Sequence, residues 1–168
     1  MKILLLSDTH SYIDDKILNY VKDADEVWHA GDIGSLQVTS AIEQHSKLRA
    51  VYGNIDDYTI RQSIPLHQKF KIDQLTVWIT HIGGYPKRYS PAIKKDLIAN
   101  TPDLFICGHS HILKVMRDPA LNLLHMNPGA IGIKGFHHKR TMLRFKIENS
   151  TIKDLEVVDF GKRGANVR

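Results

Sequence analysis

Residues 2–10 read KILLLSDTH, a compact apolar run that is followed directly by Asp8 and His10. A short apolar run that stops at polar residues is typical of a buried strand, which we expect over Lys2–Ser7. The next stretch, DDKILNYV at 14–21, places apolar residues at helical spacing behind two acids and therefore predicts a helix. A strand followed by a helix begins a β-α-β unit, so this opening indicates an α/β protein.

Strand-like and helix-like segments keep alternating through the first half of the chain. The next expected elements are a strand at 26–29 (EVWH), a helix at 35–44 with Ser35 as its N-cap, and a strand at 48–51 (LRAV). Strands that alternate with helices predict β-α-β units and a largely parallel sheet.

The second half of the chain is richer in strands. We expect a hairpin over 70–72 and 76–80, and a helix from Pro91 to about Ala99 with Ser90 as its cap. A buried strand is expected at 104–107, and four further strand-like runs follow at 113–117, 122–126, 141–147 and 152–158. The C-terminal third should therefore be mostly antiparallel. The simplest architecture is a mixed α/β protein with two packed sheets and helices outside them.

Length and composition limit the classes of function. A chain of 168 residues suits one domain, which we expect over 1–160, with a basic, disordered tail at 161–168. The single cysteine, Cys107, excludes a disulfide framework and is expected in the core. The apolar runs are too short for a signal peptide or a membrane span, so we expect a cytoplasmic protein without a membrane partner. The net charge of +5 suits an anionic substrate, and the ten histidines suit metal binding or acid–base chemistry.

Side chains of the metal-ligand type follow five of the expected strands. They are Asp8 and His10 after ILLLS, Asp32 after EVWHAG, Asn54 after LRAVYG, His81 after LTVWIT, and His109 and His111 after LFICG. The carboxyl ends of strands in open α/β sheets meet at one crevice, so we expect these side chains to lie together. Each motif alone is an ordinary turn, whereas five strand ends of this kind indicate one site.

The types of ligand narrow the choice of metal. Asp, Asn and His without a thiolate exclude a structural zinc site and suit divalent ions, for which we expect Mn²⁺, with Ni²⁺, Fe²⁺ or Zn²⁺ as alternatives. Seven ligands are too many for one ion with open positions, so we expect two ions per chain. Two ions about 3.5–4 Å apart can clamp the oxygens of an in-line phosphoryl displacement. One carboxylate has to bridge them, and Asp32, alone on its strand end, is the candidate.

The motifs DTH at 8–10, GD at 31–32, GN at 53–54, His81 and GHSH at 108–111 resemble, in this order, those of the calcineurin-like metallophosphoesterase superfamily. The short chain and the NPG at 127–129 resemble its small bacterial and archaeal branch, the YfcE-like phosphodiesterases. The resemblance implies a four-layer α/β sandwich of two mixed β-sheets flanked by helices, with a dimetal site at the C-terminal ends of the strands. It also implies two ligand sets, Asp8, His10, Asp32 and His111 for the first ion, and Asp32, Asn54, His81 and His109 for the second.

The activity that the resemblance implies is hydrolysis of phosphodiester bonds by attack of a metal-bridging hydroxide, with His109 stabilising the developing charge. Larger relatives have a histidine after Gly-Asn that protonates the leaving group, and this sequence has Ile55 there. Because Ile55 cannot donate a proton, we expect diesters with acidic leaving groups. The expected catalytic residues are His109, Asn54 and Asp56. For Asp56 two interpretations are open: it orients water or Asn54, or it is an acid that only stabilises the turn.

Two functions of other classes stay open. One is a non-catalytic metal- or protein-binding scaffold of the same fold, like the retromer-subunit branch, although scaffold relatives lose metal ligands and all seven are present here. The other is a nucleic-acid binder, which rests only on the basic charge. We expect a small phosphodiester or nucleotide substrate, no specific nucleic-acid partner, and a homodimer.

The remaining aromatic and basic residues allow further expectations. The loop Tyr85–Tyr89 (YPKRY) is either a phosphate- and base-binding loop or an ordinary solvated loop. For the other histidines we expect His29 to pack near the site, His45 and His67 to lie on the surface, His125 to lie in a strand, and His137 and His138 to lie in a turn.

Overall fold

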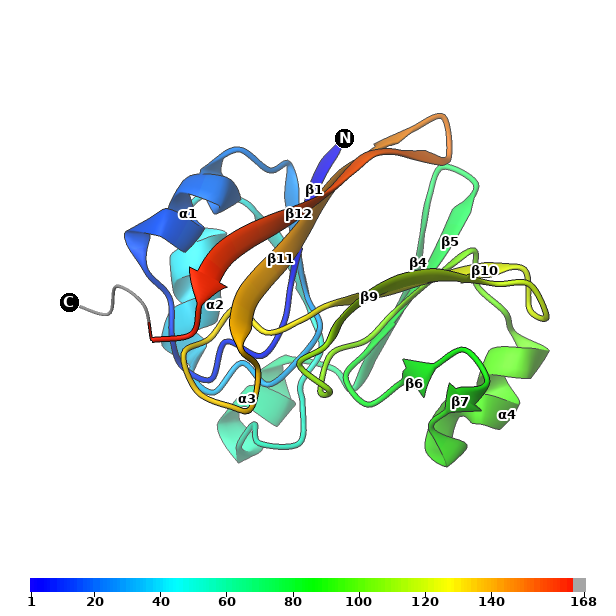
Figure 1. The fold of residues 1–168 in the computed structure, drawn as a ribbon, viewed down its shortest axis with the longest axis horizontal. Helices are drawn as coiled ribbons and strands as arrows, with labels where there is room; N and C mark the ends of the chain where they lie inside the picture. Colours follow the sequence, from blue (N-terminus) through cyan, green and yellow to red (C-terminus); the bar gives the residue numbers. More distant parts are fainter. Residues whose placement is uncertain (165–168) are drawn as a thin grey trace.

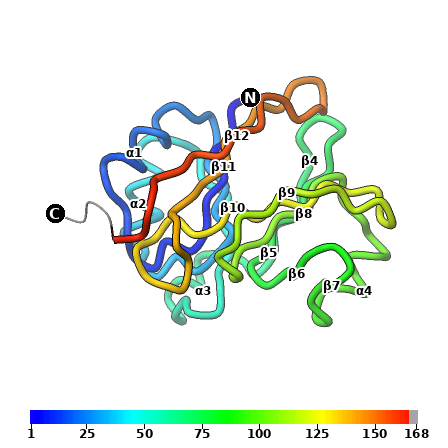
Figure 2. The backbone as a smooth tube through the Cα atoms, viewed as in Figure 1, coloured from blue at the N-terminus to red at the C-terminus, as the bar shows by residue number. Residues whose placement is uncertain are grey.

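The first sheet joins segments from opposite ends of the chain. Its strands, in this computed structural model that describes residues 1–164, are β1 Lys2–Leu6, β2 Glu26–His29, β3 Lys47–Ala50, β11 Lys139–Glu148 and β12 Thr151–Lys162. The strand order is β12-β11-β1-β2-β3, with β1, β2 and β3 parallel and β11 antiparallel to β1. Lys2 lies opposite Lys146, and Figure 2 shows β1 running beside β11.

The second sheet contains segments from the middle of the chain. Its strands are β4 His67–Ile72, β5 Leu75–Thr80, β8 Leu104–Ile106, β9 Leu113–Asp118 and β10 Leu123–Pro128. They are ordered β4-β5-β8-β10-β9, with β5, β8 and β10 parallel and the two outer strands antiparallel to their neighbours. A short hairpin of β6 (Gly84–Tyr85) and β7 (Arg88–Tyr89) follows β5.

Helices cover the outer faces of both sheets, which gives four layers (Figure 1). The helices are α1 Asp15–Lys22, α2 Leu36–Glu43, α3 Tyr58–Ser63 and α4 Pro91–Ala99. The apolar side chains of α1 and α2 pack against one face of the first sheet, and those of α4 pack against the second sheet. The faces that the two sheets turn toward each other form a third core around Trp28, Ile79 and Ile106. Alternate residues of a strand face opposite sides of its sheet, so each buried strand contributes side chains to two of these cores.

The four-layer sandwich and the order of its elements confirm the expectation from sequence. Asp14 and Ser35 cap α1 and α2 with their side chains. Ser90 is the N-cap of α4 and Pro91 begins the helix, as expected, although among the described residues the Ser90 side chain makes no capping hydrogen bond. The helix α3 was not predicted.

At the C-terminal end, β12 continues to Lys162, so residues 161–162 of the expected tail are strand. Arg163 donates backbone and side-chain hydrogen bonds to the carbonyl oxygens of His138 and His137. Residues 165–168, the rest of that tail, lie outside the described part of the chain.

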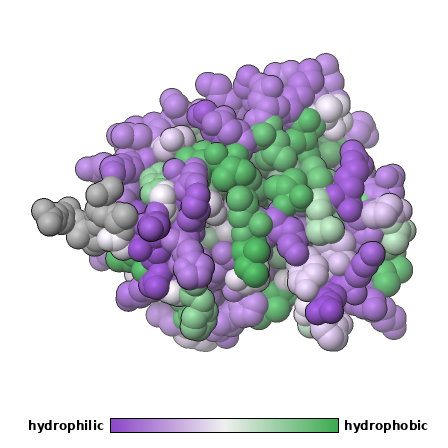
Figure 3. All heavy atoms as spheres, in the orientation of Figure 1, coloured by the Kyte–Doolittle hydropathy of each residue, from purple (hydrophilic) through white to green (hydrophobic). Residues whose placement is uncertain are grey.

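Some apolar side chains stay outside the cores. Val115 and Met116 on β9 and Leu155 and Val157 on β12 are exposed. Figure 3 shows apolar residues gathered on the face that carries these strands. Across the residues that the structure describes, no helix is both long and apolar enough to cross a membrane.

Candidate metal centre

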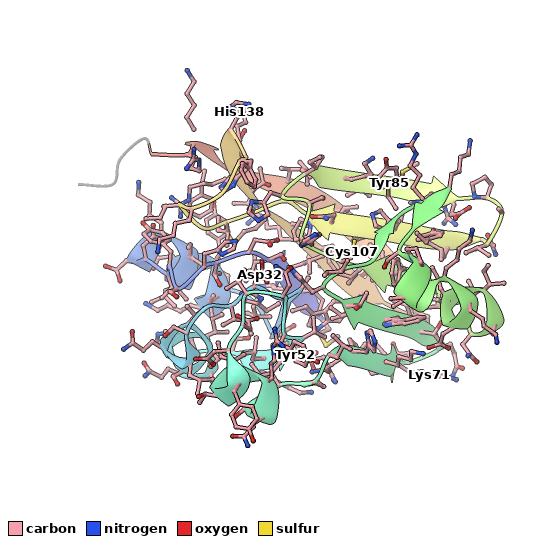
Figure 4. All side chains as sticks on the ribbon, turned by 90° about the horizontal axis from the view of Figure 1, so that it is seen from below. Asp32, Tyr52, Lys71, Tyr85, Cys107 and His138 are labelled. Atoms are coloured by element: carbon pink, nitrogen blue, oxygen red, sulfur yellow. The ribbon has the colours of Figure 1, made fainter. Side chains whose placement is uncertain are left out.

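The carboxyl ends of β1, β2, β5 and β8 bring ligand-type side chains from distant parts of the sequence together. Two groups of ligand-type side chains overlap here, and inside each group the ligand atoms all lie within 4.8 Å of one another. They are Asp8, His10 and His111 in the first group, and Asp8, Asp32 and His81 in the second. Five of the seven residues predicted as ligands therefore meet at one place, on the face where Figure 4 labels Asp32.

The backbone at this site adopts a conformation that L-residues rarely take. The five candidate residues with positive φ are Asp8 (56°), His10 (48°), Asp32 (54°), His109 (66°) and His111 (57°). Left-handed backbone in a non-glycine residue costs free energy, and such residues cluster at functional sites. The surrounding packing has to hold these five residues in this conformation.

Two glycines allow the strand ends to approach one another. A Cβ atom on Gly53 would overlap the carboxylate of Asp32, and one on Gly31 would lie 2.5 Å from Nδ1 of His81. Glycine directly before a ligand-type residue is therefore a packing requirement at these positions.

The two carboxylate oxygens of Asp32 face different groups. Oδ1 lies 3.1 Å from Nε2 of His81, and Oδ2 lies 3.9 Å from Nε2 of His10. The backbone N–H of Ile55 donates to Oδ1 at 3.1 Å and fixes the carboxylate. Asp32 therefore lies between both groups, as does Asp8, which belongs to each of them.

The hydrogen bonds of His81 leave its Nε2 facing this centre, 3.1 Å from Oδ1 of Asp32. Nδ1 donates to the carbonyl oxygen of Ala30 at 2.7 Å, so Nε2 is the ligand atom whenever the ring is neutral. Nε2 of His81 and Oδ1 of Asp8 are both buried, and neither has a hydrogen-bond partner among the described residues. Buried polar atoms without partners are costly, and a cation among carboxylates and imidazoles would satisfy both. The donor set thus fits a divalent metal ion.

Burial and neighbouring charges set the protonation of the site. Burial lowers the pKa values of His10 and His109 below the usual value, which keeps both rings neutral and able to bind a metal at neutral pH. Burial opposes protonation of His81 as well, but the carboxylates of Asp32 and Asp8 outweigh it and raise its pKa. Burial would likewise raise the pKa of Asp32, and His81 reverses this and lowers it.

Asn54 and His109 lie at the edge of the cluster. The His109 ring is 5.3 Å from the His81 ring, and its backbone N–H donates to Oδ2 of Asp8 at 3.2 Å. Asn54 is exposed, and its carbonyl oxygen accepts a hydrogen bond from Arg61. The His109 ring is not part of either compact group of histidines and acids, and the ligand roles of His109 and Asn54 stay predictions.

Asp56 is buried and its carboxylate is already in use. Its oxygens accept hydrogen bonds from the backbone N–H groups of Ile33, Gly34 and Gly53, at 3.1, 2.6 and 2.7 Å. These contacts tie the loop after β2 to the loop after β3, as a turn acid would. They leave the predicted catalytic role of Asp56 without support.

The sequence offers His137 and His138 as alternative general acids, but it does not predict that His137 contacts the site. It lies in the loop before β11, as expected, but it is buried and its Nδ1 is 3.3 Å from Nδ1 of His111. A separation of 26 residues gave no sign of this contact. Its neighbour His138 is exposed.

The other histidines fall where expected, with one exception. His29 is fully buried and contacts the Thr9 hydroxyl, and burial lowers its pKa to about 3. His45 is exposed, and His125 lies in β10. His67 was expected on the surface, but it is half-buried against Thr80, since it lies in β4 beside β5.

The aromatic rings of the Tyr85–Tyr89 loop make contacts within the protein. Lys114 places its ammonium 3.9 Å from the centre of the Tyr85 ring, and the Tyr89 hydroxyl donates to Asp118 at 2.7 Å. These contacts do not separate the two predicted alternatives, a phosphate- and base-binding loop or a solvated loop, and both stay predictions.

Comparison with known proteins assigns the chain to a family. A model of the calcineurin-like phosphoesterase superfamily domain matches residues 1–150. The chain belongs to this superfamily. A curated protein described as a probable metallophosphoesterase, from Methanothermobacter thermautotrophicus, is 26% identical over 137 residues, or 77% of each chain.

Solved structures share the fold of this phosphoesterase domain. One, described as a novel archaeal phosphodiesterase, is 24% identical, with a TM-score of 0.75 over 95% of this chain and 99% of its own. Another is wild-type Vps29 complexed with Zn²⁺ from Entamoeba histolytica, at 17% identity and a TM-score of 0.71 over 96% and 100% of the two chains. At these identities the similarity establishes the architecture, and the chemistry has to come from the residues of the site.

Proposed function

We propose that this phosphoesterase is a dinuclear metal-dependent phosphodiesterase. The observation that supports it best is the pair of overlapping ligand groups, which share Asp8 and flank the two oxygens of Asp32. Two divalent ions bound there would lower the pKa of water and polarise the oxygens of a phosphoryl group. In this proposal, Asp8, His10, Asp32 and His111 hold one ion, and Asp32, Asn54, His81 and His109 hold the other.

The protein residues have separate tasks in this reaction. Asp32 would contribute a ligand oxygen to each ion, and the Ile55 amide orients its carboxylate for this task. His109, which is exposed and whose ring is kept neutral by burial and neighbouring charges, would contact the phosphoryl oxygens and stabilise developing charge. Ile55 supplies no proton to the leaving group, which favours diesters whose leaving group is already a good one.

The alternative function is that of a non-catalytic metal- or protein-binding scaffold of the same fold. The similarity to the Vps29 fold supports it. Against it, the chain keeps ligand-type side chains in two overlapping groups, which a scaffold has no need to keep. We therefore favour the enzyme.

The test is hydrolysis of bis(p-nitrophenyl) phosphate by protein stripped with a chelator and reloaded with Mn²⁺. We expect activity that depends on the metal and falls by at least about 10²-fold in Asp32→Asn, since a ligand matters more than the groups that support one. Asp15→Asn, an exposed acid in the first turn of α1, is the matched control and should keep full activity. Equal activity with and without metal would reject the proposal.

A further inference from the structure

A cavity of about 540 Å³ opens beside the candidate metal centre. Both Asn54 and His81 line it, so it is continuous with the site that would hold the phosphoryl group. Its remaining wall comes from the loop after β3, from α3, and from the start of α4. Cavities of 300–1,000 Å³ are typical of small-molecule sites.

The cavity wall is largely apolar. Leu66 and Ile82 line it and are 46% and 43% exposed, and the buried Ile93 and the ring of Tyr52 complete the apolar surface. Figure 4 shows Tyr52 on the same side of the molecule as Asp32, next to α3. Large aliphatic side chains that stay exposed in a concave surface mark a place where an apolar group binds.

A cation stands at one side of this cavity. Arg61 donates to the carbonyl oxygen of Asn54 at 3.0 Å, and its guanidinium lies 5.1 Å from the centre of the Tyr52 ring. These two contacts fix the guanidinium beside a predicted metal ligand. A cavity that combines apolar walls with one positioned cation suits a ligand that has an apolar body and an anionic end.

We propose that this cavity binds an organic ester group of the phosphodiester substrate and that this group is a large apolar one, such as an aryl ring or a nucleobase. The inference rests on the proposed function, because it places the phosphoryl group at the metal centre. A nucleobase and a simple aryl group share this chemistry. The residues that select the group are Leu66 and Ile82, with Tyr52 and Arg61 closing one side of the cavity.

Binding of uncleavable phosphonates to the Mn²⁺-loaded protein, measured by calorimetry, tests the inference without relying on turnover. Phenylphosphonate and methylphosphonate carry the same anionic group and differ only in the organic one. Burying the phenyl ring in an apolar cavity should make phenylphosphonate bind at least about tenfold more tightly. A 5′-phosphono analogue of AMP distinguishes a nucleobase from a simple aryl group. It should bind more tightly than phenylphosphonate if the cavity suits a nucleobase. It should bind more weakly if the cavity suits a simple aryl group.

Variants show whether this cavity causes the preference. Leu66→Ser and Ile82→Ser should each reduce the ratio of the two affinities toward one and leave methylphosphonate binding unchanged. Ile98→Ser is the control, because Ile98 is an isoleucine of α4 that is 53% exposed and does not line the cavity. Equal affinity of the native protein for the two phosphonates overturns the inference. Metal-independent binding of both, without diester hydrolysis, overturns the proposed function itself.

Discussion

Nδ1 of His137 lies 3.3 Å from Nδ1 of His111, and the second nitrogen of His137 lies 3.0 Å from the carbonyl oxygen of Gly132. A carbonyl oxygen can only accept, so Nε2 of His137 carries the proton and its Nδ1 is the acceptor. His111 therefore donates from Nδ1 and presents the lone pair of Nε2 to Asp8 and His10. The Gly132 carbonyl thus fixes the tautomer of His137, and His137 in turn fixes the tautomer of the candidate metal ligand His111.

His137→Phe should weaken metal binding at the His111 side of the centre. Residues that orient a metal-bound histidine typically change metal affinity by about 10–100-fold. Calorimetric titration of the metal-free variant with Mn²⁺ measures the change. His138→Phe, at an exposed neighbour, is the control and should bind like the native protein. Unchanged affinity in His137→Phe would show that the ring pair has no effect on the ligand.

Asp32→Asn should weaken both metal ions together, because the two carboxylate oxygens face histidines of different groups. His81→Ala should affect mainly one ion, since its single free nitrogen faces one group. Metal analysis after dialysis against Mn²⁺ distinguishes the two variants by the number of ions retained. Two tightly bound ions and native activity in Asp32→Asn would disprove the bridging role.

The chain should hydrolyse aryl phosphodiesters with a higher kcat/KM than alkyl phosphomonoesters. A diester with a phenolate leaving group needs no proton from the position that Ile55 occupies, whereas an alkoxide does. Phosphoprotein turnover should be negligible for the same reason. A preference for alkyl monoesters with the same metal would contradict this and indicate another general acid.

Ile55→His should raise rates mainly for poor leaving groups. The side chain of Ile55 is 46% exposed, so a histidine fits there. Asp56, the neighbour that could orient the new ring, already accepts three backbone hydrogen bonds. The gain should therefore stay below the roughly 10²–10⁴-fold of a well-positioned acid. Rates with alkyl and aryl diesters measure it, and a larger gain would mean that Asp56 can be recruited.

Glu26 should contribute to stability in a defined pH range. It is buried, which alone would raise its pKa, but hydrogen bonds from Arg49, Lys47 and Trp28 lower the pKa from 4.5 to about 2. A lowered folded-state pKa gives stability that is present above pH 4.5 and is lost as the pH falls toward 2. Glu26→Gln should lower the free energy of unfolding at pH 7 by roughly 2–3 kcal/mol and reduce the loss on acidification. Denaturant unfolding across this range measures both, with Glu43→Gln as an exposed control. A constant difference between native and variant protein from pH 7 to 2 would contradict the linkage.

The sequence was sufficient for the arrangement of the elements because buried strands and amphipathic helices carry strong periodic patterns. It also located Asp8, His10, Asp32, His81 and His111, since ligand types recur at strand ends. It did not reveal α3, whose six residues are too few for a periodic pattern.

Two other features of the site depend on the folded chain. The left-handed backbone of Asp8 and Asp32 follows from how the strand ends pack, and side-chain type gives no direct sign of it. The contact between His111 and His137 depends on where the loop before β11 comes to rest. Both lie beyond the reach of local patterns.

The most direct test of two metal ions held between Asp8 and Asp32 is anomalous diffraction from crystals soaked in Mn²⁺. We expect two peaks about 3.5–4 Å apart, one within reach of Asp8, His10 and His111 and the other beside His81, with Asp32 between them. A single peak, or peaks remote from Asp32, would contradict the dinuclear centre.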